Sequence, residues 1–156
     1  MRLIEAKDGL FIFRLARRER DLLTHVLKQF PVGGGPTAPL SKSGDEQLLA
    51  EHEKLLGEAL AEQRTEHKRQ LDAFLGEQGR FAEDGKNHFR LRLTTVQVDW
   101  LLRVLNEVRV GLWTKLGQPE NLAPLALAGQ LDAVVTMELC ALFQTRLLAA
   151  LGGESN

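Results

Sequence analysis

Cysteine and serine are both scarce in this sequence. Cys140 is the only cysteine in 156 residues, which excludes an internal disulfide framework and any cysteine-rich zinc site. Serine occurs only at Ser41, Ser43 and Ser155, in predicted loops or the tail, and there is no Gly-x-Ser-x-Gly motif. A hydrolase triad therefore has no support in the sequence.

The sequence also lacks an excess of charge of either sign. It has 20 lysines and arginines against 21 aspartates and glutamates, a net charge of −1. This balance excludes a uniformly basic nucleic-acid coat and an acidic solvating tail. We expect one globular domain over residues 1–151, followed by a short tail at 152–156, because 44% of the residues are apolar.

Long uninterrupted apolar runs are missing as well. Charges interrupt the N-terminus every few residues, so it has no signal-peptide core. The most apolar stretch, 122–151, contains Asp132, Glu138 and Arg146, each of which costs about 2.5–3.5 kcal/mol at the centre of a bilayer. We therefore expect a cytoplasmic protein with no membrane contact.

The apolar spacing predicts an α+β domain, mostly helical, with about four helices and a small antiparallel sheet. Strands are expected at 2–6 and 10–15 around an Asp-Gly turn, and at 89–93. Helices are expected at 17–30, 46–78, 96–116 and 130–151, with loops at 31–43 and 79–85. One long helix over 46–78 is favoured over two, with Ser43 and Glu46 as its capping box.

A strand–helix pattern occurs twice in the sequence. Phe13-Arg14-Leu15, leading into Asp21, Leu23, Val26 and Leu27, recurs 78 residues later as Leu91-Arg92-Leu93, leading into Asp99, Leu101, Val104 and Leu105. Coincidence is an equal alternative, because any strand–helix unit needs such a pattern. A true pseudo-repeat predicts that the two strands share one sheet, with both helices on one face.

Residues suited to metal or phosphate binding show no binding pattern. His25, His52, His67 and His88 lie at predicted polar positions without metal-ligand spacing. The glycine run 33–35 is not followed by the Gly-Lys-Ser/Thr of a phosphate-binding loop. We therefore expect no cofactor and no metal.

Three arginines alternate with the apolar residues of the predicted strands. Arg14, Arg90 and Arg92 are expected on the sheet face that points away from the core. This face is a candidate contact surface for phosphate or an acidic partner. A solvated sheet surface, on which arginine discourages edge pairing, is the favoured alternative.

Two predicted helices carry a charge inside their apolar arcs, Arg109 in 96–116 and Glu138 in 130–151. A buried charge needs a partner, so we expect Arg109 and Glu138 to form a structural ion pair, or each to find another polar group. The last helix is also apolar on the face opposite its main stripe, so a homodimer through that face is a further hypothesis. That candidate dimer face comprises Ala133, Met137, Cys140, Leu147 and Leu151.

Two helix patterns resemble a known family. They are Leu105-Asn106-x-x-Arg109-x-x-Leu112-x-x-x-Leu116-Gly117 and Phe143-Gln144-x-x-Leu147-x-x-x-Leu151. With the arginine-rich N-terminal hairpin, they resemble the bacterial domain-of-unknown-function family that includes the actinobacterial oxidative-stress regulator AosR. Glu138 falls where the family pattern has an acidic residue.

The resemblance implies a small cytoplasmic non-enzyme with a role in stress response or transcription. The redox sensing described for the family's named regulator, which works with an alternative sigma factor, needs a cysteine pair and is not carried over to a chain with one cysteine. Family genes lie beside the adaptor of the Clp protease, which adds a role near protein quality control. We expect a protein-interaction or regulatory module without catalysis. The alternative is a nucleic-acid-binding regulator that uses Arg14, Arg90 and Arg92.

Overall fold

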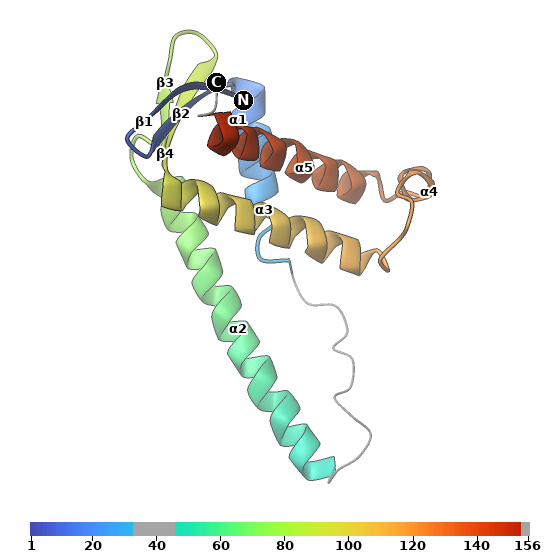
Figure 1. Cartoon of the computed structure of the whole chain (residues 1–156). Helices are drawn as coiled ribbons and strands as arrows, with labels where there is room; N and C mark the ends of the chain where they lie inside the picture. The colour runs from blue at the N-terminus through green and yellow to red at the C-terminus, as the bar shows by residue number, and fades with distance from the viewer. Residues whose placement is uncertain (33–45, 154–156) are drawn as a thin grey trace.

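The computed structural model describes residues 1–32 and 46–153, and within them lie five helices and a four-stranded antiparallel sheet. The predicted α+β class with a mostly helical content is confirmed (Figure 1). The helices are α1 (Arg17–Leu27), α2 (Glu46–Gly76), α3 (Thr95–Lys115), α4 (Ala123–Leu127) and α5 (Leu131–Gly152).

The sheet has the strand order β1-β2-β4-β3. β1 (Arg2–Lys7) and β2 (Leu10–Ala16) form the predicted hairpin. Its turn residues Asp8 and Gly9 have φ values of 53° and 74°, the left-handed conformation that a two-residue hairpin turn requires. β4 (His88–Thr94) pairs with β2 on one side and with β3 (Phe81–Glu83) on the other.

The repeated pattern corresponds to a pseudo-two-fold axis between the two central strands. Phe13 pairs with Leu91, its own equivalent 78 residues later. The N-caps Ala16 and Thr94 are likewise equivalent, and each has a capping box with the residue three positions on. Two backbone hydrogen bonds obey the same offset: Arg17 N to Asn87 O at 2.9 Å, and Thr95 N to Gly9 O at 3.1 Å. The pseudo-repeat is therefore present in three dimensions.

The core lies between the sheet and helices α1, α3 and α5, and equivalent residues of the two units meet in it. Leu23 and Leu101 are both buried, as are Val26 and Val104. α5 supplies a third layer against α3 and α1. Most of the fully buried side chains come from these elements, including Phe13, Leu15, Leu27, Leu91, Leu93, Leu105 and Leu147.

α2 departs from this arrangement. It is a single helix of 31 residues, as the favoured alternative predicted, but only Leu71 and Phe74 of it are buried. Figure 1 shows α2 running away from the other helices, so that its N-terminal half projects from the body of the molecule. The capping residue predicted for it, Ser43, lies outside the described residues.

Two elements were not predicted from the sequence. β3 occupies three residues of the expected loop at 79–85, and α4 is a five-residue helix between α3 and α5. Both are too short to show an apolar period. The pairing of β3 with β4 places Phe81 opposite Leu91.

Candidate functional site

The predicted basic sheet face (Arg14, Arg90 and Arg92) comes from the two central strands. Arg14 and Arg90 are direct cross-strand partners, and Arg92 lies opposite Ile12. Arg2 of β1 pairs with Arg14, which adds a fourth arginine to the cluster. Cross-strand neighbours lie about 5 Å apart at Cβ, so these four positive charges repel one another unless a counter-ion is present.

Asp84 is that counter-ion, and sequence reasoning missed it. Its Oδ2 lies 3.1 Å from Arg14 Nε and 3.2 Å from Arg90 Nε. The Asp84 N–H donates to the carbonyl oxygen of His88 at 2.9 Å, which fixes the carboxylate beside the sheet. A side-chain hydrogen bond from Arg90 is the main reason that the pKa of Asp84 is lowered, with a smaller contribution from Arg14. The basic face is thus partly neutralised from within the chain.

Arg109 and Glu138 do not form the predicted buried pair. Both side chains are exposed, and no ion pair joins them anywhere in residues 1–32 and 46–153. They do line one hollow of about 370 Å³ between α3 and α5, together with Trp113 and Glu120. The prediction of burial was wrong because the apolar arc of each helix is wider than the stripe that the core covers.

The proposed dimer face of α5 is also corrected by the structure. Met137, Cys140 and Leu147 are buried against the chain's own core, and Ala133 and Leu151 are half-buried. They form the inner face of α5. Burial raises the pKa of the Cys140 thiol to about 11, against the smaller lowering effect of Arg109. The sequence could not distinguish the two faces of α5 because both are apolar.

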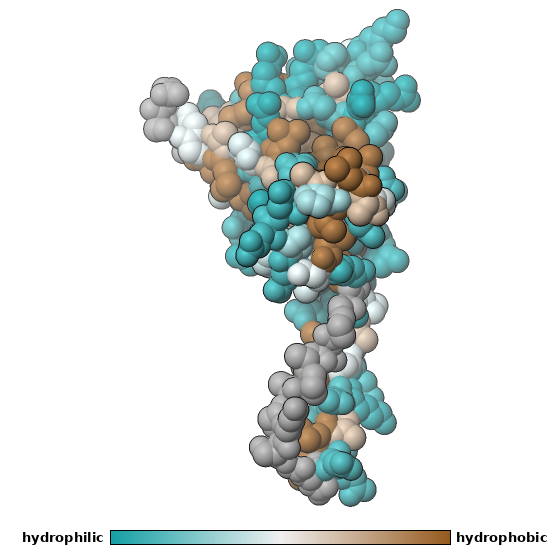
Figure 2. All heavy atoms as spheres, turned by 90° about the vertical axis from the view of Figure 1, so that its right-hand side faces the viewer, coloured by the Kyte–Doolittle hydropathy of each residue, from teal (hydrophilic) through white to brown (hydrophobic). Residues whose placement is uncertain are grey.

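The exposed side of α5 is instead the stripe that the sequence assigned to the core. This outer α5 face comprises four large apolar side chains that are 45–57% exposed: Leu131, Val135, Leu142 and Leu148. Leu127 of α4 extends it and is 91% exposed. Figure 2 views the molecule from the end where α4 lies, and it shows apolar side chains gathered on that surface. An apolar face of this extent in water is typical of an interaction site.

α2 carries a second exposed apolar surface. Its leucine face comprises Leu48, Leu49, Leu55, Leu56 and Leu60, of which Leu48, Leu55 and Leu56 are 43–63% exposed. At 3.6 residues per turn, acidic side chains flank the leucine face on both sides, whereas Lys54 lies on the opposite side of the helix. These flanking residues are Glu46, Glu51, Glu53, Glu58 and Glu62.

Arg80 fixes the C-terminal end of α2 to the sheet. It is 8% exposed, and its guanidinium donates to the carbonyl oxygens of Phe74 at 3.1 Å and Arg92 at 3.2 Å. It also pairs with Glu77 and lies 4.0 Å from the centre of the Phe74 ring. Sequence reasoning did not single out Arg80, because it lies in a loop where no periodicity predicts burial.

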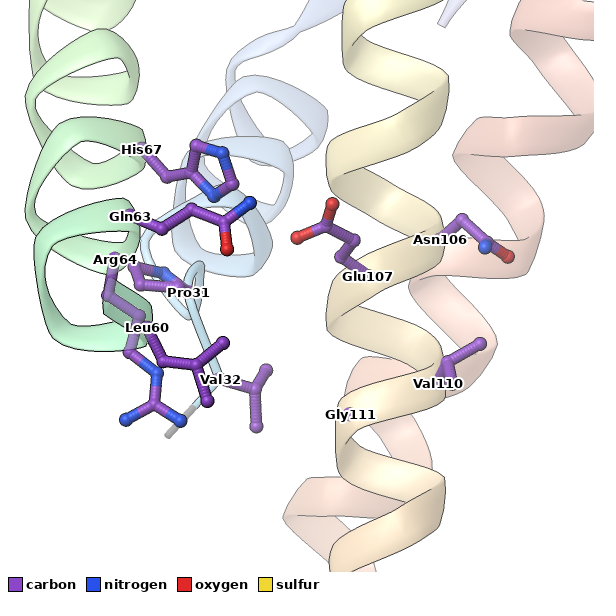
Figure 3. Close-up of a pocket in the computed structure, with 10 residues that line it drawn as sticks. All are labelled: Pro31, Val32, Leu60, Gln63, Arg64, His67, Asn106, Glu107, Val110 and Gly111. Atoms are coloured by element: carbon purple, nitrogen blue, oxygen red, sulfur yellow. The ribbon is translucent and has the colours of Figure 1, made fainter. Parts of the chain in front are cut away.

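A cleft of about 430 Å³ opens where α2 diverges from α3 (Figure 3). The Glu107 carboxylate of α3 points across it toward Gln63 and His67 of α2, whereas Asn106 points to the other side of α3. The His67 ring stacks on Phe30, with ring centroids 5.3 Å apart. The cleft is mixed in character, and no group in it pairs a nucleophile with a base.

Within the described residues, no group of three or more histidine, cysteine or acidic side chains is placed to hold a metal ion. α5 is the one described helix that is long and apolar enough to cross a membrane by length and composition, with a third of its most apolar window buried inside the chain. No family model, curated protein or solved structure matches the chain.

Proposed function

We propose that this chain is a non-enzymatic protein-interaction module of the cytoplasm, and that the leucine face of α2 is its main contact surface. The observation that carries the proposal is the projection of a long helix whose exposed leucines contact no other described element. An isolated helix gains little stability in water, and most helical stability comes from packing of the apolar face. A partner that covers these leucines supplies that packing.

The charges around the leucine face define the partner. Acidic side chains on both of its flanks favour an amphipathic helix with leucine-like anchors and basic flanking residues, because opposite charges at such positions select the partner and its orientation. They disfavour a parallel pairing of α2 with itself, which would place glutamate next to glutamate. The resemblance to the AosR-containing family adds two partner classes to this proposal: an alternative sigma factor and the adaptor of the Clp protease.

The test is affinity capture from the lysate of the source organism, with and without reductant, followed by mass spectrometry. The variant carries Leu48→Gln, Leu55→Gln and Leu56→Gln, since glutamine keeps the helix propensity of leucine. Lys54→Gln, on the opposite side of α2, is the matched control. We expect a partner that the wild type and the control retain and the triple variant loses. Equal capture by all three proteins would exclude the leucine face as the contact surface.

A second candidate function is nucleic-acid binding through the basic sheet face, and the cross-strand cluster of four arginines favours it. Phosphate contacts make such binding fall steeply with salt. Titration of a labelled duplex DNA and a labelled single-stranded RNA tests this candidate. Binding that weakens with salt and is lost in Arg90→Ala/Arg92→Ala supports it, and indifference to both changes excludes it.

A further inference from the structure

The outer α5 face has a regular spacing along the helix. Leu131, Val135, Glu138, Leu142, Thr145 and Ala149 follow one another at intervals of four and three residues, the spacing by which one helix packs along another. The strip spans about 27 Å at 1.5 Å per residue. Its residues are exposed and lie on the side of α5 opposite the buried Cys140 and Leu147.

Two opposite charges lie at equal distances from the middle of this strip. Glu138 precedes Leu142 by four residues and Arg146 follows it by four, about 6 Å to either side. Both side chains are exposed. Neither takes part in an ion pair with another side chain in the part of the chain that the structure describes.

We infer that a second copy of this chain docks on the outer α5 face, with the two α5 helices antiparallel about a two-fold axis at Leu142. In this arrangement Leu142 meets Leu142 of the second copy. Glu138 of each copy lies level with Arg146 of the other, so that two ion pairs form. A parallel arrangement places like charges opposite each other, which is unfavourable.

The same charges argue against a bilayer as the occupant of this face. Glu138 and Arg146 flank the centre of the apolar strip, where ionised groups are costly in lipid. The inner face of α5 is committed to the core of the chain through Cys140 and Leu147. A helix crossing a membrane alone would have to break that packing.

Charge reversal tests the pairing, with sedimentation equilibrium of the full chain as the measurement. Glu138→Arg and Arg146→Glu each bring like charges together twice, so we expect the dissociation constant of each variant to rise at least tenfold. The double variant restores opposite charges and should return close to the wild-type value. An equimolar mixture of the two single variants should form a heterodimer, because each supplies the charges that the other lacks.

Cross-linking tests the position of the two-fold axis. Leu142→Cys should form a disulfide-linked dimer on mild oxidation, because the residue faces its own equivalent. Leu148→Cys, on the flank of the same face, is the matched control and should remain mostly unlinked. Cys140 does not interfere, since its side chain is 0% exposed.

Several results would overturn the inference. These are a monomeric wild type throughout the micromolar range, single variants that dimerise like the wild type, or equal cross-linking at 142 and 148. Flotation of the wild type with phospholipid vesicles would identify lipid as the occupant instead. The outcome is separable from that for the proposed function. The α2 glutamine variant should dimerise normally, and Leu142→Cys under reduction should keep its captured partner.

Discussion

Arg80 offers the sharpest test of how the projecting helix is held, through the substitution Arg80→Met. Methionine keeps the apolar stem of the side chain and removes the guanidinium. The change leaves the carbonyl oxygens of Phe74 and Arg92 without their donor. A hydrogen bond from a charged group contributes about 1.5–3 kcal/mol, and the contact with the Phe74 ring adds about 1 kcal/mol. Glu77 is largely exposed, so its pairing adds little.

We therefore expect Arg80→Met to lower the free energy of unfolding by about 3 kcal/mol. Urea denaturation followed by circular dichroism measures this loss. Arg80→Lys should lie between the two proteins, because an ammonium reaches one carbonyl group but cannot serve two. Glu77→Gln is the matched control, with an expected change below about 0.5 kcal/mol. A loss of less than 0.5 kcal/mol in Arg80→Met would refute this account of the anchor.

Two further predictions concern the core and the cleft. Native protein should resist Ellman's reagent, because burial and a pKa of about 11 leave Cys140 only about one-thousandth ionised at pH 8. One thiol per chain should react in guanidinium, and rapid native labelling would contradict the burial. The raised pKa stabilises the folded protein below about pH 9, and this contribution is lost as the pH approaches 11. The stability advantage over Cys140→Ala should narrow in that range. A Cβ atom at Gly111 would lie 2.7 Å from Val32 Cβ, so Gly111→Ala should destabilise the wild type by about 1 kcal/mol. In a Val32→Gly background it should stabilise by a similar amount, through helix propensity. Thermal denaturation of the four proteins decides the sign.

The hairpin, the central strands and the long helices could be predicted from the sequence because each has its own period. The Asp8-Gly9 turn and the Thr94 cap also carry local signals that the structure confirms. The orientation of α5 could not be predicted. Its two faces are equally apolar, and only packing against α1 and α3 decides that Cys140 points inward and Leu142 outward.

The candidate site was predictable only in part for a related reason. Arg14, Arg90 and Arg92 follow from strand alternation, whereas Asp84 approaches Arg14 and Arg90 from outside any regular element. The exposure of Arg109 and Glu138 depends on how far the neighbouring helices extend over α3 and α5. A single helical pattern contains no information about the length of its neighbours.

The pseudo-two-fold axis has a consequence for fragments of this chain. Because Phe13 and Leu91 are each other's equivalents, the strand edge that β2 offers to β4 is nearly self-complementary, and so is the edge that β4 offers to β2. An isolated N-terminal or C-terminal half therefore exposes an edge that can pair with another copy of the same half, and both edges are unpaired until the two halves meet during folding. Domain-swapped oligomers that join β2 or β4 to its own counterpart are the misfolded products to look for when refolding is done at high protein concentration.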